Sequence, residues 1–146
     1  MYYPVDMDID ELRTTDYGLW IESQAKLLEQ GKFDKLDVKR VADQLRLGAV
    51  SWQLALIGHA TDILECKLGL LLTPQYNEQR QWSRAILRSQ AQVQQLLASS
   101  PSLAKTMTSD TLATCYEAGR NIFLAAYPDA APPERCPFTW TDIFWS

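Results

Sequence analysis

The segment HATDILECK, residues 59–67, gathers side chains that can bind a metal ion or move a proton. It contains the only histidine of the chain, His59, with Asp62, Glu65 and Cys66 within two helical turns. At 100° per residue, His59, Asp62 and Cys66 fall within a sector of about 60° on a helical wheel, with Glu65 beside it. Zinc usually takes three or four ligands in a tetrahedral array, however, and one helix seldom supplies them all. A metal-dependent enzyme at this segment is therefore our third hypothesis, and we expect no cofactor.

The favoured interpretation of the same segment is structural. Gly58 and Gly69 are expected to let this flank of a helix pack closely against a neighbouring helix. His59 and Cys66 then lie at the border of the core, because thiols are commonly buried as small apolar groups. The two carboxylates of the segment are expected to face solvent.

Three arginines, Arg80, Arg84 and Arg88, form a ladder with a four-residue spacing that can follow phosphates along a groove. The same ladder is typical of any solvated face of an amphipathic helix. Glutamines surround it in place of aromatic residues, and the formal net charge of the chain is −4, which opposes general affinity for polyanions. A nucleic-acid-associated protein that uses this ladder is therefore the alternative hypothesis and is not favoured.

No set of residues predicts a hydrolytic site. Ser99, Ser100 and Ser102 stand at the start of an expected helix, where serine is common as a cap, and one distant histidine would have to serve every triad. The sequence contains neither a glycine-rich phosphate loop nor an H-E-x-x-H pair. We assign no catalytic residue and favour a protein that is not an enzyme.

Length and composition favour one cytoplasmic domain. A chain of 146 residues buries about 68–70% of the surface that it exposes when unfolded, which is enough to fold without a metal or disulfides. Its three cysteines are odd in number and far apart, which favours reduced thiols in a cytoplasm. We expect no signal peptide, because the N-terminus is acidic, and no membrane span, because the longest apolar run carries charges.

Apolar residues at helical spacing predict an all-α protein, a single-domain antiparallel bundle of four to five helices with a short aromatic C-terminal turn. Residues 1–15 are expected to be an irregular acidic N-terminus, residues 16–127 the bundle, and residues 128–146 a proline-rich, aromatic tail that docks on it. The expected helices run from about residue 16 to 31, from 37 to 72, from 78 to 99, briefly after Pro101, and from 110 to 128. Nothing between residues 37 and 72 breaks a helix outright, and Gly48 is the position most favourable for a kink or break.

Two of the expected helices have apolar faces that should be buried. On the first helix this face consists of Tyr17, Trp20, Ile21, Gln24, Leu27 and Leu28. On the second helix it consists of Val38, Val41, Leu45, Ala49, Trp52 and Leu56. Trp20, Trp52 and Trp82 are accordingly expected in the core, because rings of this size dominate core burial.

The tail ends in aromatic residues that allow two interpretations. Thr139 and Asp142 have the spacing of a capping box, which predicts one terminal helical turn. Docking of this turn on the bundle would bury its rings. Alternatively, the rings form a surface for a protein partner or a second copy of the chain, because aromatic residues are enriched at interface hot spots. The candidates for such a surface are Phe138, Trp140, Phe144 and Trp145.

Five segments occur in a familiar order: DYGLW (16–20), FDKLD (33–37), the tryptophan of QWSRAI (81–86), LLASSPSL (96–103) and ERCPFTW (134–140). Together they resemble the bacterial family of domains of unknown function numbered twenty-nine, and the resemblance covers nearly the whole chain. It implies an all-helical single domain and brings no established reaction.

The chain departs from that family where the family is most polar. The family's His-Leu-Leu-Lys segment corresponds to residues 64–67, so its histidine position is Leu64 here and His59 inherits no role from the resemblance. Where family members are richer in glutamate, the segment VADQLRLG keeps only Asp43 of an acidic cluster. Our first hypothesis is therefore a small non-enzymatic module for protein interaction or regulation, whose partner is another protein or a second copy of the chain.

Overall fold

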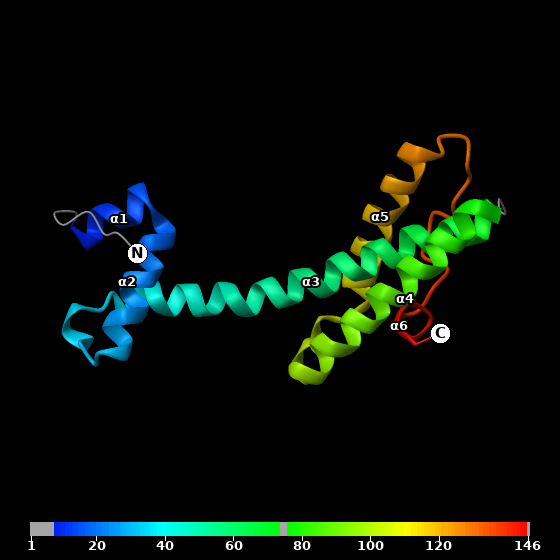
Figure 1. Ribbon diagram of the computed structural model, residues 1–146. Coiled ribbons are helices and arrows are strands. Elements are labelled where there is room, and N and C mark those ends of the chain that lie inside the picture. Colours follow the sequence, from blue (N-terminus) through cyan, green and yellow to red (C-terminus); the bar gives the residue numbers. More distant parts are fainter. Residues whose placement is uncertain (1–7, 74–75, 146) are drawn as a thin grey trace. The chain divides into compact units, whose positions relative to one another are not determined.

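The computed structural model describes residues 8–73 and 76–145, and every regular element within these ranges is a helix (Figure 1). The α-helices are α1 (Ile9–Thr15), α2 (Tyr17–Glu29), α3 (Val38–Leu72), α4 (Tyr76–Ser99), α5 (Ser109–Ala126) and α6 (Trp140–Phe144). Two 3₁₀ helices, η1 (Phe33–Lys35) and η2 (Pro101–Thr106), connect them. The predicted all-α helical class is confirmed.

The N-terminal segment is more regular than expected. Residues 9–15 form α1, and Leu12 is buried. The side chain of Asp8 accepts a hydrogen bond from the backbone N–H of Asp10, at 3.4 Å, and Asp10 and Glu11 occupy the first turn, where the helix dipole favours negative charge. The prediction of an irregular segment is therefore wrong for residues 9–15, because its acidic residues cap a helix. Residues 1–7 lie outside the described part of the chain.

Residue contacts divide the chain into two compact units, Met1–Ala49 and Val50–Ser146. The N-terminal unit contains α1, α2, η1 and the first turns of α3, and the C-terminal unit contains the rest of α3 with α4, η2, α5 and α6. The boundary falls inside α3, which remains helical at Gly48, the position that the sequence favoured for any kink or break.

In the C-terminal unit, α4 and α5 both pack against α3 at glycines. A Cβ atom on Gly119 of α5 would lie 3.0 Å from the carbonyl oxygen of Thr61 and 3.2 Å from the backbone nitrogen of Glu65. A Cβ atom on Gly69 of α3 would lie 2.7 Å from the ring of Trp82. Gly58 was also expected at a close contact, but a Cβ there would meet nothing within 4 Å.

The core of the C-terminal unit includes the end of the tail. Its largest fully buried side chains are Leu56, Ile63, Leu64, Leu68, Val93, Cys115, Phe123, Ile143 and Phe144. The capping box predicted at the start of α6 is present: the Thr139 side chain accepts from the N–H of Asp142, and the Asp142 carboxylate accepts from the N–H of Thr139 at 2.8 Å. The buried Gln90 side chain donates to the carbonyl of Ile143 at 2.8 Å and ties α6 to α4.

The two apolar faces that were expected to be buried are covered only in part. Trp20, Gln24 and Leu27 are buried on α2 and Leu56 is buried on α3. The exposed members are Tyr17, Ile21, Leu28, Val38, Leu45, Ala49 and Trp52. Trp52 is 41% exposed, so its placement in the core was wrong. In residues 8–73 and 76–145, no helix combines the length and apolarity that a membrane crossing requires.

Candidate functional site

The residues of HATDILECK do not assemble a metal site. Cys66 is buried and Asp62 is exposed, while His59 and Glu65 are partly buried. Burial, followed by the charges of Glu65 and Asp62, raises the pKa of the Cys66 thiol to about 11. Nowhere in the described ranges does a group of three His, Cys, Asp or Glu side chains lie close enough to hold an ion.

The arginine ladder lies on α4. Arg80, Arg84 and Arg88 are all exposed, and none of them forms an ion pair with any residue that the structure describes. Their charges therefore remain accessible. Nucleic-acid binding by this face stays a prediction.

The aromatic tail is used largely for packing. Phe144 is fully buried and stacks on Trp140, with ring centroids 5.5 Å apart. The indole Nε1 of Trp140 donates to the carbonyl of Thr108 at 3.0 Å, and Phe138 is partly buried. Trp145 alone of the four candidates is largely exposed, at 54%. Phe144 is therefore core, and the four rings do not form one exposed surface.

A groove that the sequence analysis did not identify lies in the N-terminal unit, between α2 and the first turns of α3. Its volume is about 330 Å³. Its apolar lining consists of Trp20, Ile21, Ala25, Leu28, Val41 and Leu45. Two glutamines, Gln24 and Gln44, complete it, and no charged residue lines it. We call this feature the N-terminal groove.

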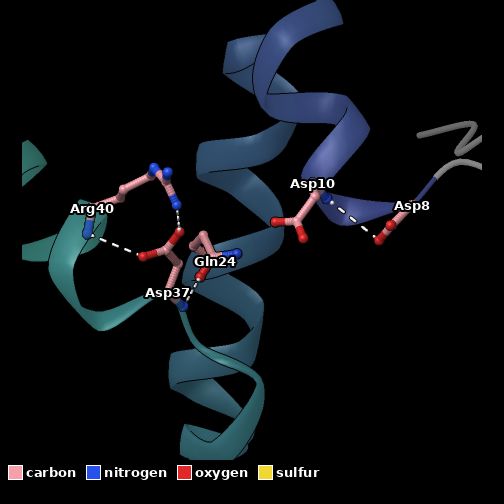
Figure 2. A network of polar contacts seen from close by, with 5 residues as sticks. All are labelled: Asp8, Asp10, Gln24, Asp37 and Arg40. Carbon is pink, nitrogen blue, oxygen red and sulfur yellow. Dashed lines mark hydrogen bonds and ion pairs between the residues drawn. The ribbon is translucent and has the colours of Figure 1, made fainter.

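Hydrogen bonds at the end of α2 and at the start of α3 hold the two walls of the N-terminal groove together. Gly31, at φ 69°, ends α2, where the N–H of Gly31 donates to Leu28 and the N–H of Lys32 donates to Leu27, the pattern of a Schellman motif. The buried side chain of Gln24 then accepts the N–H of Asp37 at 2.8 Å. This bond fastens the start of α3 to the middle of α2 (Figure 2).

Asp37 also organises the first turn of α3. Its carboxylate accepts from the backbone N–H of Arg40 at 3.2 Å and pairs with the guanidinium of the same residue (Figure 2). Because Arg40 donates this side-chain hydrogen bond, the pKa of Asp37 is lowered from its ordinary value. These two charges pair with each other and do not line the N-terminal groove.

The N-terminal unit also holds two buried polar atoms that lack a partner. Among the residues that the structure describes, Nε of Arg13 and Nε1 of Trp20 are the two buried side-chain atoms without a hydrogen-bond partner. A buried donor without an acceptor costs about 1–3 kcal/mol. Trp20 is 1% exposed and lines the N-terminal groove, and its ring stacks on that of Tyr17 with centroids 5.3 Å apart. The groove therefore lies beside a buried N–H donor that has no acceptor in the described part of the chain.

The groove escaped the sequence analysis because its residues have the spacing of a buried face. The sequence did contain one signal, a surplus of apolar residues. α2 and the start of α3 carry more large apolar side chains than can be covered by the short helix α1 and by the contact of α2 with α3. Such a surplus indicates a surface patch, and contiguous apolar patches are a mark of interaction sites.

Comparisons with known proteins give one match. A family model described as "Domain of unknown function DUF29" matches residues 12–146, nearly the whole chain. No curated protein and no solved structure matches the chain.

Proposed function

The chain belongs to the family of domains of unknown function DUF29, whose description assigns no activity, and we propose that it is a non-enzymatic module that binds another protein through the N-terminal groove. One observation carries this proposal: the groove is apolar and uncharged, and its rim side chains Ile21, Leu28 and Leu45 are exposed. Leu45 is 73% exposed, the largest value among the exposed large apolar residues.

The chemistry of the groove defines what can fill it. An uncharged lining favours apolar side chains and would leave an inserted charge without a counterion. Two helices that flank a groove are a common receptor for the apolar face of a third helix, which inserts side chains at i, i+3 or i+4, and i+7. We therefore infer that the partner presents an amphipathic helix, supplied by a different protein or by a second copy of this chain.

Capture of partners from the native cell by a tagged chain tests this proposal. Wild-type protein, Leu45→Glu and Leu87→Glu would be compared by quantitative mass spectrometry, with light scattering on the purified chains to detect self-association. Leu87 is the matched control, because it is an exposed leucine on α4 that does not line the groove. Both substitutions are expected to leave the fold intact, since surface changes usually alter stability by less than about 0.5 kcal/mol.

The expected result is a protein, or a dimer of the chain, that is retained by Leu87→Glu and lost with Leu45→Glu. A charge placed in a desolvated apolar contact should weaken binding at least about tenfold. Equal capture by the two variants, or an absence of both a partner and self-association, would contradict the proposal.

A second candidate function rests on the exposed ladder of Arg80, Arg84 and Arg88. Three arginines that each neutralise one phosphate should give a logarithmic salt slope of about −2 to −3. Fluorescence anisotropy with a labelled duplex and a labelled single strand measures this slope. Loss of binding when all three are replaced by glutamine would support this function, and no salt-dependent binding at micromolar protein would exclude it.

A further inference from the structure

A second hollow lies in the C-terminal unit, between α5 and the tail, and differs from the N-terminal groove in having charged residues in its lining. Its volume is about 580 Å³, within the range of about 300–1,000 Å³ that small-molecule sites occupy. We call it the α5–tail hollow. The residues that matter for its chemistry are Leu112, Tyr116, Glu117, Arg120, Glu134 and Arg135.

Two sets of hydrogen bonds, which we call clamps, join the tail to α5 and to the residue before it, one at each end of the α5–tail hollow. At one end, the hydroxyl of Tyr116 and Nε of Arg120 both donate to the carbonyl of Pro133, at 2.5 Å and 3.2 Å. At the other end, Nε1 of Trp140 donates to the carbonyl of Thr108 at 3.0 Å. The tail therefore runs along α5 in the opposite direction, and the hollow lies between fixed walls.

The four charged residues of the hollow are two of each sign and form no ion pairs. Glu117 and Arg120 are three residues apart on α5, a spacing at which opposite charges usually interact. Arg120 instead donates Nε and Nη2 to the carbonyls of Pro133 and Pro132. Neither this pair nor Glu134 and Arg135 of the tail form an ion pair within the described part of the chain. The hollow thus offers positive and negative groups that do not neutralise each other.

The lining also changes in character along α5. The charged Glu117 and Arg120 lie toward the C-terminal end of the hollow, whereas the uncharged Ser109, Leu112 and Ala113 lie nearer the N-terminal end. From residue 109 to residue 120 the wall extends about 16 Å at 1.5 Å per residue. A ligand with a doubly charged head and a short apolar chain matches this order.

We propose that the α5–tail hollow binds a free α-amino acid with an aliphatic side chain. Its carboxylate would accept two parallel hydrogen bonds from the guanidinium of Arg135. It would also lie near the positive charge of Arg120, whose Nε and Nη2 donate to the tail. Its ammonium group would lie against Glu117 and Glu134. The aliphatic side chain would contact Leu112. This site is independent of the N-terminal groove and lies in the other unit.

Isothermal titration calorimetry of the full chain with three probes tests the proposal. The probes are L-leucine, 4-methylpentanoate, which lacks the ammonium group, and 3-methylbutylamine, which lacks the carboxylate. L-leucine is expected to bind with saturation, and each analogue at least about tenfold more weakly, because each loses its charge-assisted hydrogen bonds. Failure of L-leucine to saturate below about 10 mM, or equal binding of the analogues, would overturn the proposal.

Variants locate the binding. Glu117→Gln and Arg135→Gln are chosen because both side chains are exposed and neither forms a clamp. Each should weaken L-leucine binding about tenfold with an unchanged unfolding temperature. Arg88→Gln, an exposed arginine on α4 that does not line the hollow, is the matched control and should bind as wild type does. Binding that survives both substitutions would place the ligand elsewhere and overturn the assignment.

Discussion

Among the residues that the structure describes, the N-terminal unit buries three apolar side chains, Leu12, Trp20 and Leu27, whereas the C-terminal unit buries fourteen. Both units contain one buried glutamine that joins distant segments, Gln24 in the first and Gln90 in the second. The same kind of interaction, a hydrogen bond between a buried glutamine side chain and a distant backbone group, therefore supports a small core in one unit and a large core in the other. Three of the apolar side chains that the small core leaves exposed, Ile21, Leu28 and Leu45, line the N-terminal groove.

The contrast between the small and the large core would not hold if an aromatic ring of the C-terminal core could be removed with little loss of stability. Phe144 is fully buried and packs beside Trp140, so Phe144→Ala should lower the free energy of unfolding by about 3–5 kcal/mol. Trp145→Ala is the control, because this neighbouring ring is 54% exposed. Urea unfolding followed by circular dichroism measures both, and similar losses for the two variants would contradict the assignment of Phe144 to the core.

Two glycines of α3, Gly69 and Gly58, allow a tightly packed position to be compared with an open one. Gly69→Ala would place a Cβ atom 2.7 Å from the Trp82 ring and should destabilise the protein by about 1–3 kcal/mol. Gly58→Ala meets nothing within 4 Å and should stabilise it by about 0.5–1 kcal/mol, because alanine favours the helix. Thermal and urea unfolding should give opposite signs. The same sign for both would mean that the Trp82 contact does not constrain Gly69.

The buried glutamines compare the two units directly. Gln90→Ala should cost about 1–3 kcal/mol, because the carbonyl of Ile143 loses the side-chain donor that now reaches it in a buried place. Gln24→Ala removes the acceptor of the Asp37 N–H, but that group is only partly buried and water can replace the bond, so we expect about 1 kcal/mol or less. Hydrogen exchange in α6 and at the start of α3 reads the two effects separately. A larger loss at Asp37 would reverse the comparison.

Local signals explain what the sequence could predict. The expected end of the first helix at residue 31, the expected start of the second at residue 37, and the capping box of Thr139 and Asp142 each depend on residues within a few positions. Gly31, Asp37 and the capping box fulfil these roles in the structure. The all-α class follows from helical spacing for the same reason. Whether the second helix is continuous could not be predicted from Gly48, and α3 remains helical there, because a single glycine costs a helix only about 1 kcal/mol.

What the sequence could not predict depends on which faces meet. Helical spacing marks Leu45 and Trp52 as apolar-face residues as clearly as Leu56, yet only Leu56 is buried. The contact between Gln90 and Ile143 joins residues 53 positions apart, and nothing local announces it. The N-terminal groove and the α5–tail hollow were missed for this reason, since each needs two elements placed side by side.

Titration of two helix-start carboxylates gives the smallest expected effect, again one in each unit. The pKa of Asp142 is lowered chiefly because the backbone N–H of Thr139 donates to its carboxylate, with the Thr139 hydroxyl adding to this. The pKa of Asp37 is lowered chiefly by the side-chain hydrogen bond from Arg40. Each pKa is lower in the folded than in the unfolded chain. Each carboxylate therefore adds stability that is complete above its unfolded pKa and is lost as the pH falls through the folded value.

Hydrogen exchange between about pH 5 and pH 2, corrected for intrinsic rates, should accordingly show protection of α6 and of the first turn of α3 falling with pH. Asp142→Asn should remove this pH dependence from α6 and leave it at the start of α3, and Asp37→Asn should do the reverse. Each variant is thus the control for the other. If either substitution altered both segments equally, the two caps would be coupled and would not act within their own units.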